Sequence, residues 1–195
     1  MRIAILGWGA VQWEPEALAL SGPWQPDGPH LPLELARIRG DGCLTVVLYP
    51  TPETPALPVA WAWAAGSALA AVVENLRTAE RTVPGHITVL PDDGPRAVPL
   101  NPGIAGAITR WQVTQGTDAV VWTQLPANFT QRTGLPLTPT TAVAYLRGLP
   151  SADRRRAVAY LGRLPATLQT PIRQALAAAT DPPVGPPAGD GAPGC

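Results

Sequence analysis

The chain has 195 residues, and its 14 basic residues balance its 14 acidic residues, so its formal net charge is zero. A neutral chain argues against nonspecific nucleic-acid binding and against a basic membrane-surface protein. Every basic residue is arginine, which excludes a lysine Schiff base and a P-loop lysine. With two cysteines and two histidines, a four-ligand zinc site is not expected, nor is any other metal or cofactor.

The apolar runs are too short to direct the chain into or across a membrane. The first one, Ile3 to Leu6, meets glycine at once and is shorter than the core of a secretory signal. No run reaches the 18 apolar residues that a membrane-spanning helix needs. We therefore expect no membrane partner and a cytoplasmic location.

Most of the predicted strands lie in the first 125 residues. Gly40-Asp41-Gly42 separates two apolar runs, which is typical of a β-hairpin. Five prolines between residues 14 and 32 argue against regular structure there. Strands are predicted over residues 2–8, 33–39, 43–49, 57–64, 86–90 and 118–123.

Helices are predicted from an apolar stripe or from a capping residue followed by proline. Residues 68–79 carry the stripe, with Ser67 as the expected N-cap. Asn101 with Pro102 predicts a helix that ends at Gly116. Three later helices are expected to start at Thr138–Pro139, at Ser151 and at Thr170–Pro171.

Clustered early strands and late helices predict an α+β fold rather than a doubly wound sheet. We expect one domain over residues 1–180. Residues 181–195 are mostly Pro, Gly and Ala, so we expect a disordered tail in which Cys195 is exposed and has no role.

Two common kinds of site are excluded because the sequence lacks their motifs. A dinucleotide fingerprint would need a third glycine where Gln12 stands, and Pro15 interrupts the helix that would follow. The sequence also lacks G-x-S-x-G, so a serine nucleophile on an elbow is not supported. What remains is carboxylate chemistry beside the glycine-containing segment that follows the first strand.

That segment, loop 7–11, consists of Gly7, Trp8, Gly9, Ala10 and Val11. Glycines let main-chain N–H groups approach and bind a carboxylate or another oxygen anion. The alternative interpretation is an ordinary tight turn after an edge strand.

Several colinear segments over residues 1–178 resemble a bacterial branch of the γ-glutamylcyclotransferase-like family. The opening MRIAILGWGAVQW is similar to the family's first strand and its glycine, aromatic, glycine, serine, leucine loop. AVVENLRTAERT resembles the helix that ends in the family's catalytic glutamate. The other similar segments are LPLELARIRGDGCLTVVLYP, DAVVWTQLPANF, AVAYLRGLP, RRRAVAYLGRLP and TPIRQAL.

The resemblance implies a closed, mixed β-barrel or sheet flanked by helices, with a helical C-terminal part. It implies an enzyme that cyclises a γ-glutamyl amine or peptide to 5-oxoproline without a metal or nucleotide. Glu80 falls on the position of the general acid/base, and loop 7–11 falls on the segment that binds the substrate carboxylate. The small-molecule substrate is the only partner implied, and the oligomeric state is left open.

Two departures from the family pattern favour alternatives. The family serine and leucine are Ala10 and Val11 here, and the residue after the glutamate, commonly glycine, is Arg81. A cation beside Glu80 would favour its ionised form and make it a weaker base. The alternatives are a noncatalytic small-molecule binding or interaction protein on the same fold, and an amide or acyl transferase that uses the same pocket.

Other residues have a structural interpretation beside a functional one. Glu34 lies among apolar neighbours, where an unpaired buried charge is costly, so a salt bridge with Arg37 or another arginine is expected. Tryptophans at these spacings are more often core than ligand platforms, although Trp8 and Trp122 lie at strand ends that favour a pocket wall. His30 and His86 are interpreted as ordinary surface or strand-edge residues.

Overall fold

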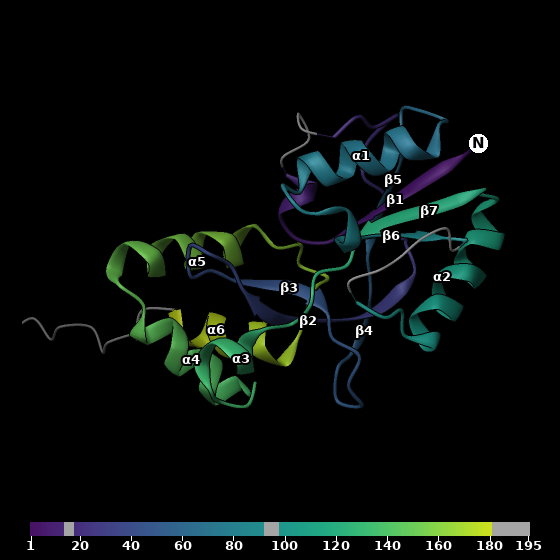
Figure 1. Ribbon diagram of the computed structural model, residues 1–195. Helices are drawn as coiled ribbons and strands as arrows, with labels where there is room; N and C mark the ends of the chain where they lie inside the picture. The colour runs from purple at the N-terminus through teal and green to yellow at the C-terminus, as the bar shows by residue number, and fades with distance from the viewer. Residues whose placement is uncertain (14–17, 92–97, 181–195) are drawn as a thin grey trace, which may run out of the picture.

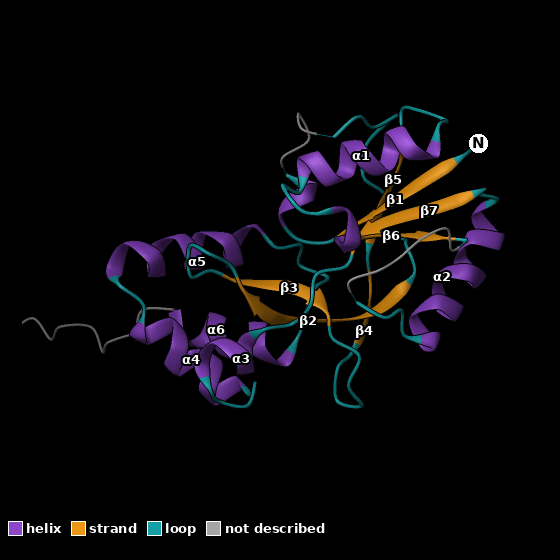
Figure 2. Ribbon diagram, viewed as in Figure 1, coloured by secondary structure: helices purple, strands orange, loops and turns teal. Residues whose placement is uncertain are grey.

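The computed structural model describes residues 1–13, 18–91 and 98–180 of the chain. These residues form a mixed α and β structure with two sheets and six α-helices (Figures 1 and 2). The expected α+β class is therefore confirmed. The expected tail at 181–195 lies outside the described residues.

The larger sheet contains four strands in the order β5-β1-β7-β6. β1 (Ile3–Gly7) runs antiparallel to β5 (Ala60–Trp63) and parallel to β7 (Ala119–Thr123), and β7 runs antiparallel to β6 (Ile87–Leu90). β1 is buried along its whole length because both faces of the sheet are covered. One face packs on α1 (Leu69–Ala79), which lies above the sheet in Figure 1.

The smaller sheet contains three strands in the order β3-β2-β4. β2 (His30–Ile38) and β3 (Leu44–Leu48) form the predicted hairpin, with Gly42 at a φ of 81° in its turn. β4 (Ala56–Pro58) pairs with the first residues of β2. β2 begins before the predicted strand and takes in Pro32, whose carbonyl accepts a hydrogen bond from the Tyr49 N–H at 2.8 Å.

The expected closed barrel is wrong for the described residues, because their strands form two separate sheets. The predicted strand 57–64 divides at Val59, which is buried between β4 and β5. Its N–H donates to Pro29 O at 3.2 Å, and its carbonyl accepts from the Gly28 N–H at 3.0 Å. These bonds hold the chain at the point where it leaves one sheet and enters the other.

Local capping chemistry explains some of the helix termini. Asn101 caps α2 (Pro102–Gln115) by accepting from the N–H groups of Gly103 and Ile104, and Gly116 ends it in a left-handed conformation. The expected cap of α1 by Ser67 is wrong: Ala68 is the N-cap, and no side chain caps this helix. Since α1 packs its apolar stripe on the sheet, tertiary burial stabilises it without a cap.

The C-terminal helices pack around the smaller sheet. They are α3 (Phe129–Thr133), which the sequence analysis does not predict, α4 (Pro139–Gly148), α5 (Ser151–Arg163) and α6 (Pro171–Thr180). α3 and α6 contact β2, while α4 contacts both α5 and α6. Their apolar residues join those of β2, β3 and α2 in one core.

Glu34 fixes α6 to β2, and none of the described arginines makes the expected salt bridge with it. Its carboxylate accepts hydrogen bonds from Thr170 Oγ1 and, at 2.7 Å, from the Leu35 N–H. Thr170 Oγ1 in turn accepts from the Arg173 N–H at 3.1 Å, as an N-cap does. Burial raises the pKa of Glu34, against smaller opposing contributions from these hydrogen bonds. Glu34 is therefore a buried anchor for a helix.

Candidate functional site

A cavity of about 480 Å³ opens where the end of α1, loop 7–11, the end of β2 and the start of α3 meet. This volume lies within the range of typical small-molecule sites, roughly 300–1,000 Å³. Among its described lining residues are Ala10, Val11, Arg37, Ile38, Arg39, Gly40, Ala79, Glu80, Arg81, Thr82, His86, Leu125, Asn128 and Arg132.

Glu80 and loop 7–11, which the sequence analysis singled out together, lie side by side in the fold. Glu80 lines the large cavity with Ala10 and Val11. It also lines a smaller neighbouring cavity of about 40 Å³ with Gly7, Trp8 and Val11. The two cavities thus share one carboxylate and one loop.

Both glycines of loop 7–11 are required by close contacts. An added Cβ at Gly7 would lie 2.6 Å from the Trp24 ring. Gly9 has a φ of 79°, which favours glycine, and an added Cβ there would lie 2.7 Å from the hydroxyl of Tyr160. A side chain at position 7 or 9 would therefore force the loop or its neighbours to move. The loop continues into a 3₁₀ turn, Ala10–Gln12, in which the Gln12 N–H donates to Gly9 O at 3.1 Å.

The end of α1 sets the position of Glu80. Glu80 is the C-cap of α1, is half-buried, and donates its N–H to Leu76 O at 2.9 Å. Arg81 follows with a φ of 50°, the left-handed conformation that favours glycine. A glycine at position 81 would adopt this conformation without strain.

Arginine side chains from the end of β2, from the residue after it and from α3 also line the cavity, and this part of the lining is called the arginine wall. Arg37 lies at the end of β2, just after an irregularity in the β2–β3 register between Leu35 and Arg37. Its Nη1 donates to Pro126 O at 2.7 Å, which holds the guanidinium in place. Arg39 makes a 2.5 Å ion pair with Asp41, so its charge is partly balanced.

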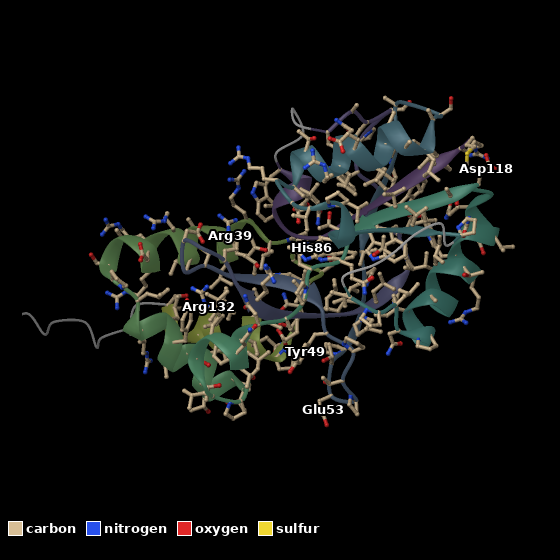
Figure 3. The ribbon with its side chains drawn as sticks, in the orientation of Figure 1. Arg39, Tyr49, Glu53, His86, Asp118 and Arg132 are labelled. Atoms are coloured by element: carbon tan, nitrogen blue, oxygen red, sulfur yellow. The ribbon has the colours of Figure 1, made fainter. Side chains whose placement is uncertain are left out.

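α3 brings a further arginine to this wall. Asn128 fastens the start of α3 to β2, since its Oδ1 accepts from the Ile38 N–H at 2.7 Å and its Nδ2 donates to Ile38 O at 3.0 Å. Arg132 lies one turn further along, where its N–H donates to Asn128 O at 2.9 Å. In the view of Figure 3, His86 lies beside the four-stranded sheet, while Arg39 and Arg132 lie nearer the C-terminal helices.

His86 lines the same cavity, next to the arginine wall. Its Nδ1 is 2.8 Å from Thr82 Oγ1. Burial, with the nearby positive charge of Arg37, lowers the pKa of His86 below its usual value of 6.5. The imidazole is thus neutral at pH 7 and can offer a hydrogen bond without adding charge.

Tyr160 connects α5 to loop 7–11 and was not singled out by sequence reasoning. Its hydroxyl is buried beside Gly9 and accepts the Val46 N–H at 3.4 Å. Burial raises the pKa of Tyr160 to about 12, with a small upward contribution from the negative charge of Glu80. The hydroxyl therefore stays protonated at neutral pH and can support the loop without acting as a base.

The other expected pocket residues divide between wall and core. Trp8 lines the small cavity beside Glu80, as its strand-end position suggested. Trp122 is fully buried and donates its Nε1–H to Gln124 Oε1 at 3.3 Å, so its expected place in a pocket wall is wrong. β7 is covered on both faces, which leaves this side chain inside the core.

Within the described ranges, no three His, Cys, Asp or Glu side chains are grouped closely enough to hold a metal ion. No helix there is long and apolar enough to cross a membrane. Comparisons with family models, with curated proteins and with solved structures find no match to this chain.

Proposed function

We propose that this chain cyclises a γ-glutamyl amine or peptide to 5-oxoproline and releases the amine, with Glu80 as the general acid/base. The supporting observation is that Glu80 lines two adjoining cavities together with loop 7–11. A base and a backbone loop at the same cavity are what this reaction requires.

The reaction needs a proton acceptor because an ammonium group cannot attack a carbonyl. Glu80 accepts a proton from the substrate α-ammonium, and the freed nitrogen attacks the γ-carbonyl carbon to form the lactam C–N bond. The original C–N bond then breaks. The two protons lost by the attacking nitrogen end on the departing amine, one of them delivered by Glu80.

In this proposal, loop 7–11 orients the substrate for ring closure. In the proposal, its main-chain N–H groups bind the α-carboxylate of the γ-glutamyl group. Ala10 keeps the backbone donor that a serine would supply at this position. Since the attack is intramolecular, correct orientation of the nitrogen and the γ-carbonyl supplies much of the rate enhancement.

A noncatalytic binding protein is the second candidate, and Arg81 is the observation that favours it. Arg81 follows Glu80 directly and lines the same cavity. A cation close to a carboxylate favours its ionised form, which is the weaker base. Such a protein would bind γ-glutamyl compounds in the same cavity without releasing an amine.

Mass-spectrometric detection of 5-oxoproline distinguishes the two candidates. Purified protein is incubated with a panel of γ-glutamyl amino acids and γ-glutamyl amines, beside the variants Glu80→Gln and Glu74→Gln. Glu74 is the matched control because it lies on the same helix, is exposed and pairs with Arg77. The cyclotransferase predicts release that Glu80→Gln abolishes and Glu74→Gln keeps. If wild type releases nothing yet binds a panel member, the binding protein is the better account.

A further inference from the structure

The charge of the cavity lining contrasts with the neutrality of the whole chain. Its described lining includes four arginines and a single carboxylate, Glu80. The charge of Arg39 is partly balanced by its ion pair with Asp41. A cavity with this balance attracts negative charge in its ligand and repels cations.

Part of the arginine wall is held by hydrogen bonds within the fold. Arg37 is held by its bond to Pro126 O, and α3 is held to β2 by the two bonds between Asn128 and Ile38. The register irregularity before Arg37 is a feature that often redirects a side chain near a functional site. The backbones that carry Arg37 and Arg132 therefore meet at one hydrogen-bonded junction, and the bond from the Arg37 guanidinium reduces the entropy that this side chain loses when it binds a carboxylate.

We infer that Arg37 and Arg132 bind a side-chain carboxylate on the departing amine, so that the substrate class is a γ-glutamyl derivative of an acidic amino acid. This inference rests on the proposed function. In that function loop 7–11 holds the γ-glutamyl end beside Glu80, which leaves the arginine wall of the same cavity to the other end of the substrate. A γ-glutamyl polyamine would place positive charge against the same wall.

The test compares γ-glutamyl-glutamate with γ-glutamyl-glutamine, which differ by one charge at nearly equal size. Wild type is expected to favour the glutamate compound in kcat/KM by about tenfold or more, as a charge-assisted hydrogen bond predicts. Arg132→Gln is expected to lower this ratio about tenfold. Arg132→Lys, which keeps the charge, is expected to retain part of the ratio. Arg110→Gln, an exposed change on α2 away from the cavity, should leave it unchanged.

The outcomes separate this inference from the proposed function. If the kcat/KM for γ-glutamyl-glutamine equals or exceeds that for γ-glutamyl-glutamate, the inference is wrong and the proposed function stands. If neither compound yields 5-oxoproline, the function fails, and calorimetric titration with the same two dipeptides decides the inference. Tighter binding of γ-glutamyl-glutamate that Arg132→Gln removes would then support it, and equal affinities would overturn it.

Discussion

Replacing Arg81 by glycine is expected to stabilise the protein. Arg81 has a φ of 50° and is exposed, and its N–H donates to Thr78 O, a bond that glycine can keep. Holding a non-glycine residue in this left-handed region costs about 1–2 kcal/mol. Glycine brings more freedom to the unfolded chain, which offsets roughly 0.4–1 kcal/mol of the gain. The net free energy of unfolding should therefore rise by about 0.5–1 kcal/mol.

Thermal and urea unfolding followed by circular dichroism would measure this gain. For a chain of this length, 1 kcal/mol moves the Tm by about 2–4 °C. Arg81→Ala is the matched control, since it removes the same charge but keeps a Cβ at the same φ. We expect Arg81→Ala to show no comparable gain. If the glycine variant is no more stable than the alanine variant, the backbone at residue 81 carries no such strain and our reasoning is wrong.

Two further predictions concern loop 7–11 and the buried carboxylate. Gly9→Ala should lower the free energy of unfolding by about 2 kcal/mol or more, because it adds a close contact with Tyr160 to the left-handed backbone strain. Gly134→Ala, at a similar φ in open space, should lower it by the strain alone. Chemical denaturation of both variants would show the difference, and equal losses of stability would contradict the contact with Tyr160. For Glu34, whose pKa burial raises above 4.5, stability is fully present below that value and is lost as pH rises through the folded-state pKa. The free energy of unfolding of Glu34→Gln, relative to that of wild type, should therefore increase as the pH of a denaturation series rises. A relative stability that stays constant or decreases with pH would refute this.

Most of the fold could be predicted because its elements are set by local chemistry. Gly42 and Asn101 occupy the turn and the cap that their sequence neighbours predict. The division of the predicted strand 57–64 at Val59 could not be foreseen, since it depends on which sheet each half pairs with. The short helix α3 was missed for a similar reason: it is held by Asn128, whose bonds go to β2, 90 residues earlier in the chain.

The candidate site was only partly visible in the sequence. Glu80 was named from the motif resemblance, and loop 7–11 was named from its glycines after a buried strand and from the same resemblance. The arginine wall could not, because Arg37 and Arg132 come from distant segments and carry no motif. Tyr160 was hidden for the same reason: only the fold places its hydroxyl against Gly9. Charges and contacts that are assembled by tertiary structure leave little periodic signal in one sequence.

The role of Glu80 is tested most directly by one rate comparison. The measurement is kcat/KM for 5-oxoproline formation from a γ-glutamyl dipeptide, in wild type and in Glu80→Gln. Loss of a general acid/base should lower this value by about a hundredfold or more. A Glu80→Gln variant that forms 5-oxoproline at the wild-type rate would contradict the proposed chemistry of the cavity.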